Sequence, residues 1–329
     1  MSPGSRNDSR PHEPTGPAER KSNLRLRGRL VQSLREFFIG RRYVEIETPC
    51  LISAPAPERY IDVIPANGRC LHPSPELCMK RLLSAGFSRI FQICKCFRKG
   101  ERGDLHLPEF TLLEWYRTGI DYQDLMEECE ALICFAAQSL GKGERILYLG
   151  KTIDLCRPWD RISVKEAFER YASVTMDQAL SSGSFDQVLV EEIEAHLGAT
   201  RPVFLYDYPA PLAALARVNP KDPTVAERFE IYLAGMEIAN GFSELNDPRE
   251  QRARFEKEQQ ERLAAGKATY PLPERFLESL ADMPEAAGIA LGVDRLAMFF
   301  CNAGRIDDVV SFTPEETRED LLDQKAGLR

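Results

Sequence analysis

Apolar residues that recur three or four positions apart predict most of the helices in this chain. The first predicted helix begins near Asn23 and ends at Gly40. A later, highly charged helix begins at Asp247-Pro248, reaches Ala265 and is followed by Gly266. The same spacing predicts further helices over residues 76–85, 122–139, 163–172, 185–196 and 293–301.

Strands are predicted between these helices from alternating side chains and flanking turn residues. Residues 89–98 and 109–117 form two predicted strands joined by a polar loop, and residues 228–244 form a hairpin that turns at Ala234-Gly235. Shorter strands are predicted over 43–47 and 288–292, whereas the stretch from 140 to 222 is less informative. Hairpins with intervening helices favour an α+β fold on a mostly antiparallel sheet flanked by helices.

Composition places the chain among globular proteins, with 43% hydrophobic and 29% charged residues. Residues 1–22 carry four Pro and two Gly without apolar periodicity, so we expect a disordered tail there and one domain over residues 23–329. The net charge of −8 argues against a general nucleic-acid coat. We also expect no membrane span and, from nine cysteines without a disulfide pattern, a cytoplasmic protein.

Several common motifs are missing from the sequence. It has no Walker A motif, no glycine-rich dinucleotide fingerprint and no readable Ser/His/Asp set. Cys94 and Cys96 lack companion ligands at zinc spacing, so we expect buried strand cysteines, and His72 has no recognisable partner.

The predicted strand 109–117 carries polar groups on one face. Alternation places Glu114 and Tyr116 on the same side as Phe110 and Leu112. A buried carboxylate needs a partner. The pattern fits either a structural ion pair or a cationic ligand held between Glu114 and Tyr116.

The predicted hairpin 228–244 suggests a metal site. Pairing outward from the turn places Glu230 opposite Ala239 and puts Glu230 and Glu237 on one face as diagonal neighbours. Two such carboxylates suit Mg²⁺ that bridges phosphates, unless the face is simply solvated. Asn240 and Glu244 continue the polar series past Gly241, a possible bulge.

The segment GIALGVDR (288–295) suggests an anion site. A glycine at the junction of strand and helix permits close backbone approach, and Arg295 falls in the first turn of the helix. Arg98, at the end of another predicted strand, is a second candidate for binding a polyphosphate.

Together these segments resemble the three signature motifs of class II aminoacyl-tRNA synthetase catalytic domains. YVEIETP, ending at Pro49, resembles motif 1, FRKGERGDLHLPEFTLLEWY (97–116) motif 2, and GIALGVDRL (288–296) motif 3. SPE (74–76) and MEIANGFSELND (236–247) are similar to the lysine branch. The resemblance covers roughly residues 23–312 and implies a class II synthetase-like antiparallel sheet, a homodimer through motif 1, and use of ATP and Mg²⁺.

The resemblance also implies a role for each matching residue. Arg98 and Arg295 are the expected catalytic residues, and Glu230 and Glu237 the expected Mg²⁺ ligands. The expected ATP contacts are Arg98, Glu101, His106, Phe110, Glu237, Ile238, Gly292 and Arg295. The expected substrate contacts are Ser74, Glu76, Glu114, Tyr116, Asn240, Glu244 and Ala290. Among these, Glu76 and Glu114 would hold the proximal amino group, and Glu244 and Tyr116 the ε-ammonium.

Three departures from the synthetase pattern refine this expectation. Lys99-Gly100 stands where synthetases usually have Asn-Glu, and Leu107 where they usually have Asn, so the adenine contacts of this loop are expected to be rearranged, with Glu101 as a substitute. Ala290 replaces a typical Gly, and its methyl group would shift the preferred position of the amine, which is consistent with a β-amino acid.

Only about 22 residues precede the first predicted helix, too few for the anticodon-binding barrel of lysyl-tRNA synthetases. The chain is therefore similar to the free-standing paralogues that activate lysine or (R)-β-lysine as an adenylate and attach it to a lysine of elongation factor P. On this reading, tRNA binding is weak or absent. Two alternatives remain, a tRNA-charging enzyme and a non-catalytic paralogue that binds lysine or nucleotide.

Overall fold

The computed structural model describes residue 16 and residues 18–317. Most of the expected tail over residues 1–22 lies outside these residues. The predicted boundary at Asn23 is nevertheless too late, because residues 18–20 form a turn and helix α1 begins at Lys21. Arg20 is buried and forms an ion pair with Glu316, so this end of the helix is fixed by the tertiary structure.

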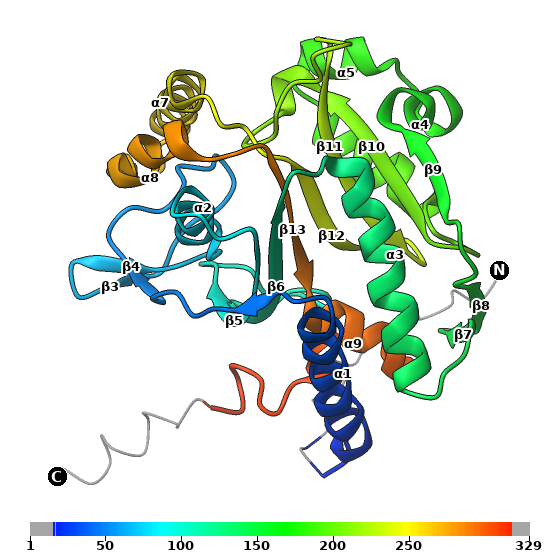
Figure 1. The fold of residues 1–329 in the computed structure, drawn as a ribbon. Coiled ribbons are helices and arrows are strands. Elements are labelled where there is room, and N and C mark those ends of the chain that lie inside the picture. The colour runs from blue at the N-terminus through cyan, green and yellow to red at the C-terminus, as the bar shows by residue number, and fades with distance from the viewer. Residues whose placement is uncertain (1–15, 17, 318–329) are drawn as a thin grey trace, which may run out of the picture.

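One eight-stranded sheet forms the centre of the molecule (Figure 1). Its strands follow the order β1 (Val44–Glu45), β5 (Arg89–Phe97), β6 (Glu109–Thr118), β13 (Ala286–Gly292), β12 (Met236–Ser243), β11 (Val225–Leu233), β10 (Val203–Pro209) and β9 (Asp160–Ser163). The two edge pairs are parallel and all inner pairs are antiparallel. The predicted α+β fold on a mostly antiparallel sheet is confirmed.

Helices cover the sheet on both sides (Figure 1). On one face, α1 (Lys21–Gly40), α3 (Tyr122–Ser139) and α9 (Val293–Cys301) share a core with the side chains of Leu113 and Trp115. Toward the other face lie α2 (Glu76–Ser84), α7 (Pro248–Ala264), α8 (Glu274–Ser279) and a small sheet of β2 (Leu51–Ile52), β4 (Arg69–Leu71) and β3 (Pro65–Ala66). Alternation along β6 separates the two environments, since its neighbouring residue Tyr116 packs with α2 and α8.

The middle of the chain contains structure that the sequence did not reveal. Besides β9 and β10, it holds the hairpin β7 (Arg145–Tyr148) and β8 (Lys151–Asp154) and the short helix α5 (Met176–Ser182). The predicted helix over 163–172 is α4 (Val164–Tyr171). The predicted helix over 185–196 is wrong as one element, because α6 (Phe185–Val188) continues into a π turn and then a 3₁₀ turn.

The register of the hairpin β11–β12 departs from the prediction. The pairs beside the Ala234-Gly235 turn are as predicted, but Ile238 is left unpaired as a bulge. Glu230 therefore lies opposite Asn240, and the predicted pairing with Ala239 is wrong. One extra residue reverses the alternation of β12 beyond the bulge.

Gly241 is not the bulge that the sequence suggested. It pairs with Phe229 on the neighbouring strand. A Cβ at position 241 would lie 2.8 Å from Cζ of the Phe229 ring, so glycine is required here for close packing of an aromatic side chain.

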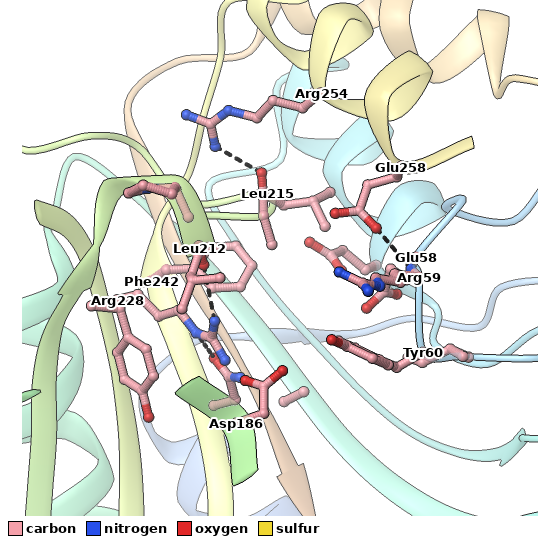
Figure 2. Close-up of a pocket in the computed structure, with 18 of the residues that line it drawn as sticks. Glu58, Arg59, Tyr60, Asp186, Leu212, Leu215, Arg228, Phe242, Arg254 and Glu258 are labelled. Carbon is pink, nitrogen blue, oxygen red and sulfur yellow. Dashed lines mark hydrogen bonds between the residues drawn. The ribbon is translucent and has the colours of Figure 1, made fainter. Parts of the chain in front are cut away.

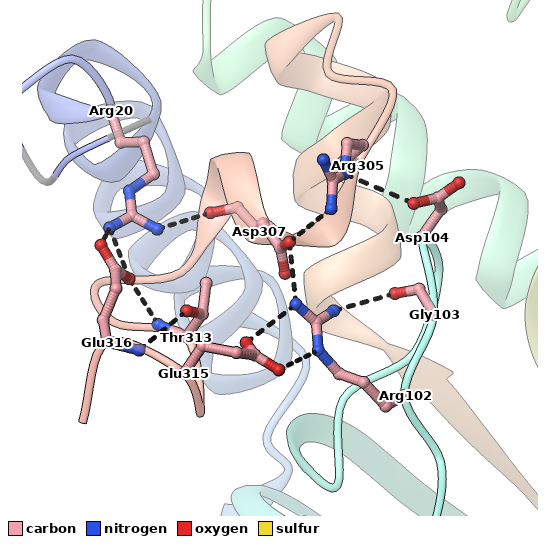
Figure 3. A network of polar contacts seen from close by, with 9 residues as sticks. All are labelled: Arg20, Arg102, Gly103, Asp104, Arg305, Asp307, Thr313, Glu315 and Glu316. Atoms are coloured by element: carbon pink, nitrogen blue, oxygen red, sulfur yellow. Dashed lines mark hydrogen bonds and ion pairs between the residues drawn. The ribbon is translucent and has the colours of Figure 1, made fainter. Parts of the chain in front are cut away.

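A polar network joins the C-terminal segment to the loop between β5 and β6 (Figure 3). Arg102 donates hydrogen bonds of 3.0 Å to Asp307 and to Glu315. Arg305 adds ion pairs to Asp104 and Asp307. The loop is thus held at several points by residues that are some 200 positions away in the sequence.

None of the described helices is long and apolar enough to cross a membrane. All nine cysteines lie in the described part of the chain, and all nine are free thiols.

Candidate functional site

Two rows of side chains cross the sheet and form the floor of a cavity of about 900 Å³. The first row occupies opposing positions on β6, β13, β12 and β11 and consists of Glu114, Ala290, Asn240 and Glu230. The second row occupies the next such positions and consists of Tyr116, Gly288, Phe242 and Arg228. Because of the bulge at Ile238, the side chains of Asn240 and Phe242 lie on the face of β12 that lines the cavity. The predicted common face of Leu112, Glu114 and Tyr116 is also the cavity face.

Glu114 is held by two hydroxyl groups. Ser74 donates to it at 2.7 Å and Tyr116 at 2.8 Å. Burial, with the negative charge of Glu76, raises the pKa of Glu114 to about 8. The carboxyl group is therefore short of positive charge, which is the condition that an ammonium group of a ligand would relieve.

A buried lysine links the two other carboxylates of this region. Lys80 forms an ion pair with Glu76 at 2.5 Å and another with Glu244, and its own side chain is 1% exposed. Burial raises the pKa of Glu244 to about 8, although Lys80 opposes this shift. We call Glu76, Glu114, Glu244 and Lys80 the carboxylate cluster.

Glu244 lies beside the second row, although it does not itself line the cavity. A Cβ on Gly288 would come within 2.5 Å of its carboxylate oxygen and 2.2 Å of the Tyr116 ring. Glycine at this position therefore allows Glu244 and Tyr116 to approach each other. That both residues bind the ε-ammonium group of the substrate stays a prediction. Glu244 already forms an ion pair with Lys80.

The other end of the first row is also charged. Arg228 donates to Glu230 at 2.7 Å and lies 3.3 Å from Asn240, and Tyr232 donates to Glu230 at 2.8 Å. Burial and then the charge of Glu237 raise the pKa of Glu230. The two predicted metal ligands therefore interact electrostatically across the hairpin.

Arg98 lines the cavity with its guanidinium group incompletely paired. Its nearest acidic partner is Glu101, at 3.9 Å, which is beyond hydrogen-bond distance. Its buried Nε has no hydrogen-bond partner among the described residues. The guanidinium lies 5.0 Å from the centroid of the Phe110 ring. Such a group is an anion site next to an aromatic platform.

Arg295 contacts two other residues that are predicted to bind the nucleotide, Glu237 and His106. It donates to the carbonyl oxygen of Glu237 at 2.7 Å, to its carboxylate at 3.3 Å, and contacts Nε2 of His106. Burial and the charge of Arg295 lower the pKa of His106, which favours the neutral imidazole. Gly292 lies beside Arg295 and the carbonyl of Ile238. We call Arg98, His106, Arg295 and Glu237 the arginine group.

The predicted residues thus fall into two sets. Those that line the cavity itself are Ser74, Glu76, Arg98, Glu114, Tyr116, Glu230, Asn240 and Ala290. Those outside its lining are Glu101, His106, Phe110, Glu237, Ile238, Gly292, Arg295 and Glu244. Arg98 connects the sets, because it lines the cavity and also stacks on Phe110.

Three separate segments contribute charged and polar residues to the cavity lining (Figure 2). Glu58, Arg59 and Tyr60 come from the loop after β2, Asp186 from α6, and Glu258 from α7. Glu258 accepts a hydrogen bond of 2.8 Å from the amide of Arg59. Burial raises the pKa of Glu58 to about 7. This part of the lining is therefore charged and polar. Its residues come from three segments that share no sequence motif.

Sequence reasoning missed two charged residues of the site. Lys80 follows Glu76 by four positions on α2, a spacing that brings side chains together on a helix. Arg228 precedes Glu230 by two positions on β11, which places both on one face. Each signal was present, but such pairs are common on protein surfaces, and only the fold shows that these are buried.

Comparison with known proteins identifies the family of this chain. A family profile described as tRNA synthetases class II (D, K and N) matches residues 16–316. A protein of Vibrio atlanticus (strain LGP32) named elongation factor P–(R)-β-lysine ligase is 39% identical over 318 residues, covering 92% of this chain and 98% of that protein.

Two further relatives carry the same name. The protein of Vibrio cholerae is 38% identical and covers 88% of this chain and 95% of its own length. The protein of Proteus mirabilis is 37% identical, and the match covers 90% of this chain and 96% of that protein. The chain therefore belongs to the class II tRNA synthetase family, in the group of its relatives named elongation factor P–(R)-β-lysine ligase.

Proposed function

We propose that this protein is an ATP-dependent ligase that activates (R)-β-lysine or lysine as an aminoacyl adenylate and transfers it to a lysine side chain of elongation factor P. The observation that carries the proposal is the cavity itself. Buried carboxyl groups with raised pKa values stand at one end, and the incompletely paired guanidinium of Arg98 stands near them. A ligand with two ammonium groups and one activated carboxylate matches both ends.

In the first step, a carboxylate oxygen of the amino acid attacks the α-phosphorus of ATP. A bond forms between that oxygen and phosphorus, and the bond to the leaving pyrophosphate breaks. The chain supplies alignment and charge, since no protein nucleophile is needed. Arg98 is positioned to bind the α-phosphate and the carboxylate, and Asn240 faces the same cavity from β12.

Glu230 and Glu237 fit a magnesium ion. Both offer carboxylate oxygens, the ligands that Mg²⁺ prefers, and burial and then the negative charge of Glu237 raise the pKa of Glu230. When bound, Mg²⁺ would neutralise charge on the phosphates of ATP. Arg228 and Tyr232 orient Glu230, and Arg295 orients Glu237.

In the second step, the neutral amine of the acceptor lysine attacks the carbonyl carbon of the adenylate. A C–N bond forms, the bond to AMP breaks with its electron pair, and the amine loses a proton. The cavity is larger than one amino acid requires, and the exposed residues Tyr60 and Asp186 in its lining give an extended side chain a route to the adenylate.

The preferred isomer follows from the position of Ala290. Its methyl group stands in the first row between Glu114, the proposed amine site, and Asn240, the proposed carboxylate site. An amino group one carbon farther from the carboxylate avoids this methyl group. The row therefore supports (R)-β-lysine as the natural substrate.

The remaining expectations complete the proposal. The motif 1 resemblance at Pro49 supports a homodimer, and nine free thiols support a cytoplasmic location. The net charge of −8 supports weak tRNA binding.

Mass spectrometry of the acceptor tests the proposal. Enzyme, ATP and each lysine isomer are incubated with elongation factor P or with tRNA. A mass increase of one lysine residue on elongation factor P supports the proposal, whereas acylation of tRNA at a matching or higher level supports the tRNA-charging alternative. Ligand binding without exchange of pyrophosphate into ATP would instead identify a non-catalytic paralogue.

A further inference from the structure

A histidine and two cysteines meet beneath the small sheet, on the cavity-facing side of β5. The ligand atoms of His72, Cys94 and Cys96 all lie within 4.8 Å of one another. The two cysteines are separated by one residue and point to the same face of β5. In the sequence they had no companion ligand, and the fold supplies one from a segment more than twenty residues earlier.

The spacing of the sulfur atoms suits a tetrahedral metal ion. The two Sγ atoms lie 3.9 Å apart. With Zn–S bonds of about 2.3 Å, the edge of a tetrahedron joining two sulfurs is about 3.8 Å. The pair therefore needs little movement to bind one ion.

The imidazole of His72 is held in the form that can bind a metal. Its Nε2 lies 2.7 Å from the carbonyl oxygen of Lys95. Because a carbonyl oxygen only accepts, Nε2 carries the proton and the lone pair is on Nδ1. Metal-binding histidines in proteins typically donate their second N–H to a carbonyl or carboxylate in this way.

The surroundings provide both rigidity and access. His72 and Cys96 are buried, at 1% and 0% exposure, whereas Cys94 is half-buried and gives a route to solvent. The amide of His72 donates to the carbonyl of the exposed Cys50 at 2.8 Å, which fixes the segment that carries the histidine. Three protein ligands leave one of the four tetrahedral positions for a solvent molecule or for another donor.

We propose that His72, Cys94 and Cys96 form a binding site for one zinc ion, separate from the magnesium carboxylates on β11 and β12. Two thiolates and an imidazole favour Zn²⁺ over Mg²⁺, which prefers oxygen ligands. The ion would join the segment after β4 to β5. Cys96 lies two residues before Arg98 and opposite Phe110, so a bound ion would stiffen the strand that positions both.

Zinc stoichiometry provides the first test. The full-length protein is stripped with a chelator, saturated with Mg²⁺ to occupy carboxylate sites, and titrated with Zn²⁺ in equilibrium dialysis. The wild type and a Cys134→Ser/Cys301→Ser control are expected to bind one ion per chain, and Cys94→Ser/Cys96→Ser less than a tenth of that. No binding by the wild type, or equal binding by the Cys94→Ser/Cys96→Ser variant, would overturn the proposal.

A second measurement avoids substitutions altogether. Alkylation of each cysteine in the wild type is followed by peptide mass spectrometry with and without Zn²⁺. Cys94 is expected to react at least tenfold more slowly when zinc is present, while the reference thiol Cys156 keeps its rate. Unchanged alkylation of Cys94 at saturating zinc would refute the site independently of how any variant folds.

Discussion

The carboxylate cluster and the arginine group differ in how completely the fold has already organised them. In the carboxylate cluster, Glu244 and Lys80 have side chains at most 1% exposed, and every member has a charged or hydroxyl partner. In the arginine group, the side chains of Arg98 and Glu237 are 28% and 36% exposed, and Arg98 retains an unpartnered Nε.

This difference indicates how the carboxylate cluster and the arginine group recognise their ligands. Buried carboxyl groups with fixed partners select a ligand by shape and charge, at the cost of desolvation. Partly exposed arginines can bind a polyphosphate without a precisely fixed geometry, because small side-chain movements accommodate a flexible anion. We therefore expect substrate identity to be decided by the carboxylate cluster, and the rate of activation by the arginine group.

Removal of the buried lysine should give the largest effect on stability. Lys80→Met leaves Glu76 and Glu244 without their shared cation, so the free energy of unfolding should fall by about 3–5 kcal/mol. Chemical denaturation measures this, with the exposed Lys165→Met as a control. Added lysine should restore part of the loss because its ammonium can replace that of Lys80. A change below 1 kcal/mol would show that the cluster is not preorganised.

Loss of the unpaired guanidinium should mainly affect the chemical step. Arg98→Ala is expected to lower pyrophosphate exchange by a factor of about 10²–10³, because one charge that stabilises the transition state is removed. Affinity for the amino acid, measured by calorimetry, should fall by a much smaller factor, because Arg98 contributes only the contact to its carboxylate. The exposed Arg170→Ala serves as the control. An equal loss of amino-acid affinity would contradict the division between the two ends.

Removal of one methyl group should change the choice between isomers. Ala290→Gly is expected to raise the activity ratio of α-lysine over (R)-β-lysine by about 10- to 200-fold, the usual effect of one methyl-sized contact in a pocket. Exchange rates with each isomer give the ratio. The matched control is Ala287→Gly on the opposite face of the same strand, which should leave the ratio unchanged. A ratio unaffected by Ala290→Gly would remove the steric basis for the isomer preference.

The pH dependence should separate the two ends further. Burial raises the pKa values of Glu114 and Glu244 to about 8, so binding an ammonium must displace protons from them below that pH. Affinity for the amino acid should therefore fall by up to about tenfold per pH unit for each of these two carboxyl groups as the pH drops below 8, whereas affinity for ATP stays nearly constant. Calorimetry between pH 6 and about 9 measures both affinities.

The same groups have the opposite effect on stability. Their pKa values are higher in the folded protein than in the unfolded chain, so the folded state binds more protons between about pH 4.5 and about pH 8. This contribution to the free energy of unfolding is present at low pH and is lost as the pH rises through 8. If stability and amino-acid affinity had slopes of the same sign, the assignment of these carboxyl groups would be wrong.

The smallest effect is expected from a change at Arg102, a surface residue that holds the loop carrying His106 of the arginine group. Arg102→Ala removes contacts to Asp307 and Glu315, and Arg102 is the group that lowers the pKa of Glu315 to about 2. Since its side chain is 32% exposed, stability should change by at most about 1 kcal/mol. KM for ATP should rise a few-fold because the loop carrying His106 loosens, and KM for the amino acid should not change.

Much of the site could be predicted because its residues follow local rules. Alternation along one strand was enough to place Glu114 and Tyr116 together, and the helix after GIALG places Arg295 in its first turn. The features of the site that could not be predicted arise where the regular alternation of a strand is interrupted. The bulge at Ile238 changes which residue of β12 opposes Glu230, and nothing in the local alternation announces it.

The sequence by itself determined the fold class, the order of the main elements and the type of chemistry, because periodicity and motif spacing act over a few residues. Only the tertiary structure decided which charges are buried. Lys80 became the shared partner of two carboxylates, and His72 the companion of two cysteines, because segments that are distant in the chain pack against each other. The energy of a charge or a thiol depends on its surroundings, and in a folded chain those surroundings come mostly from elsewhere in the sequence.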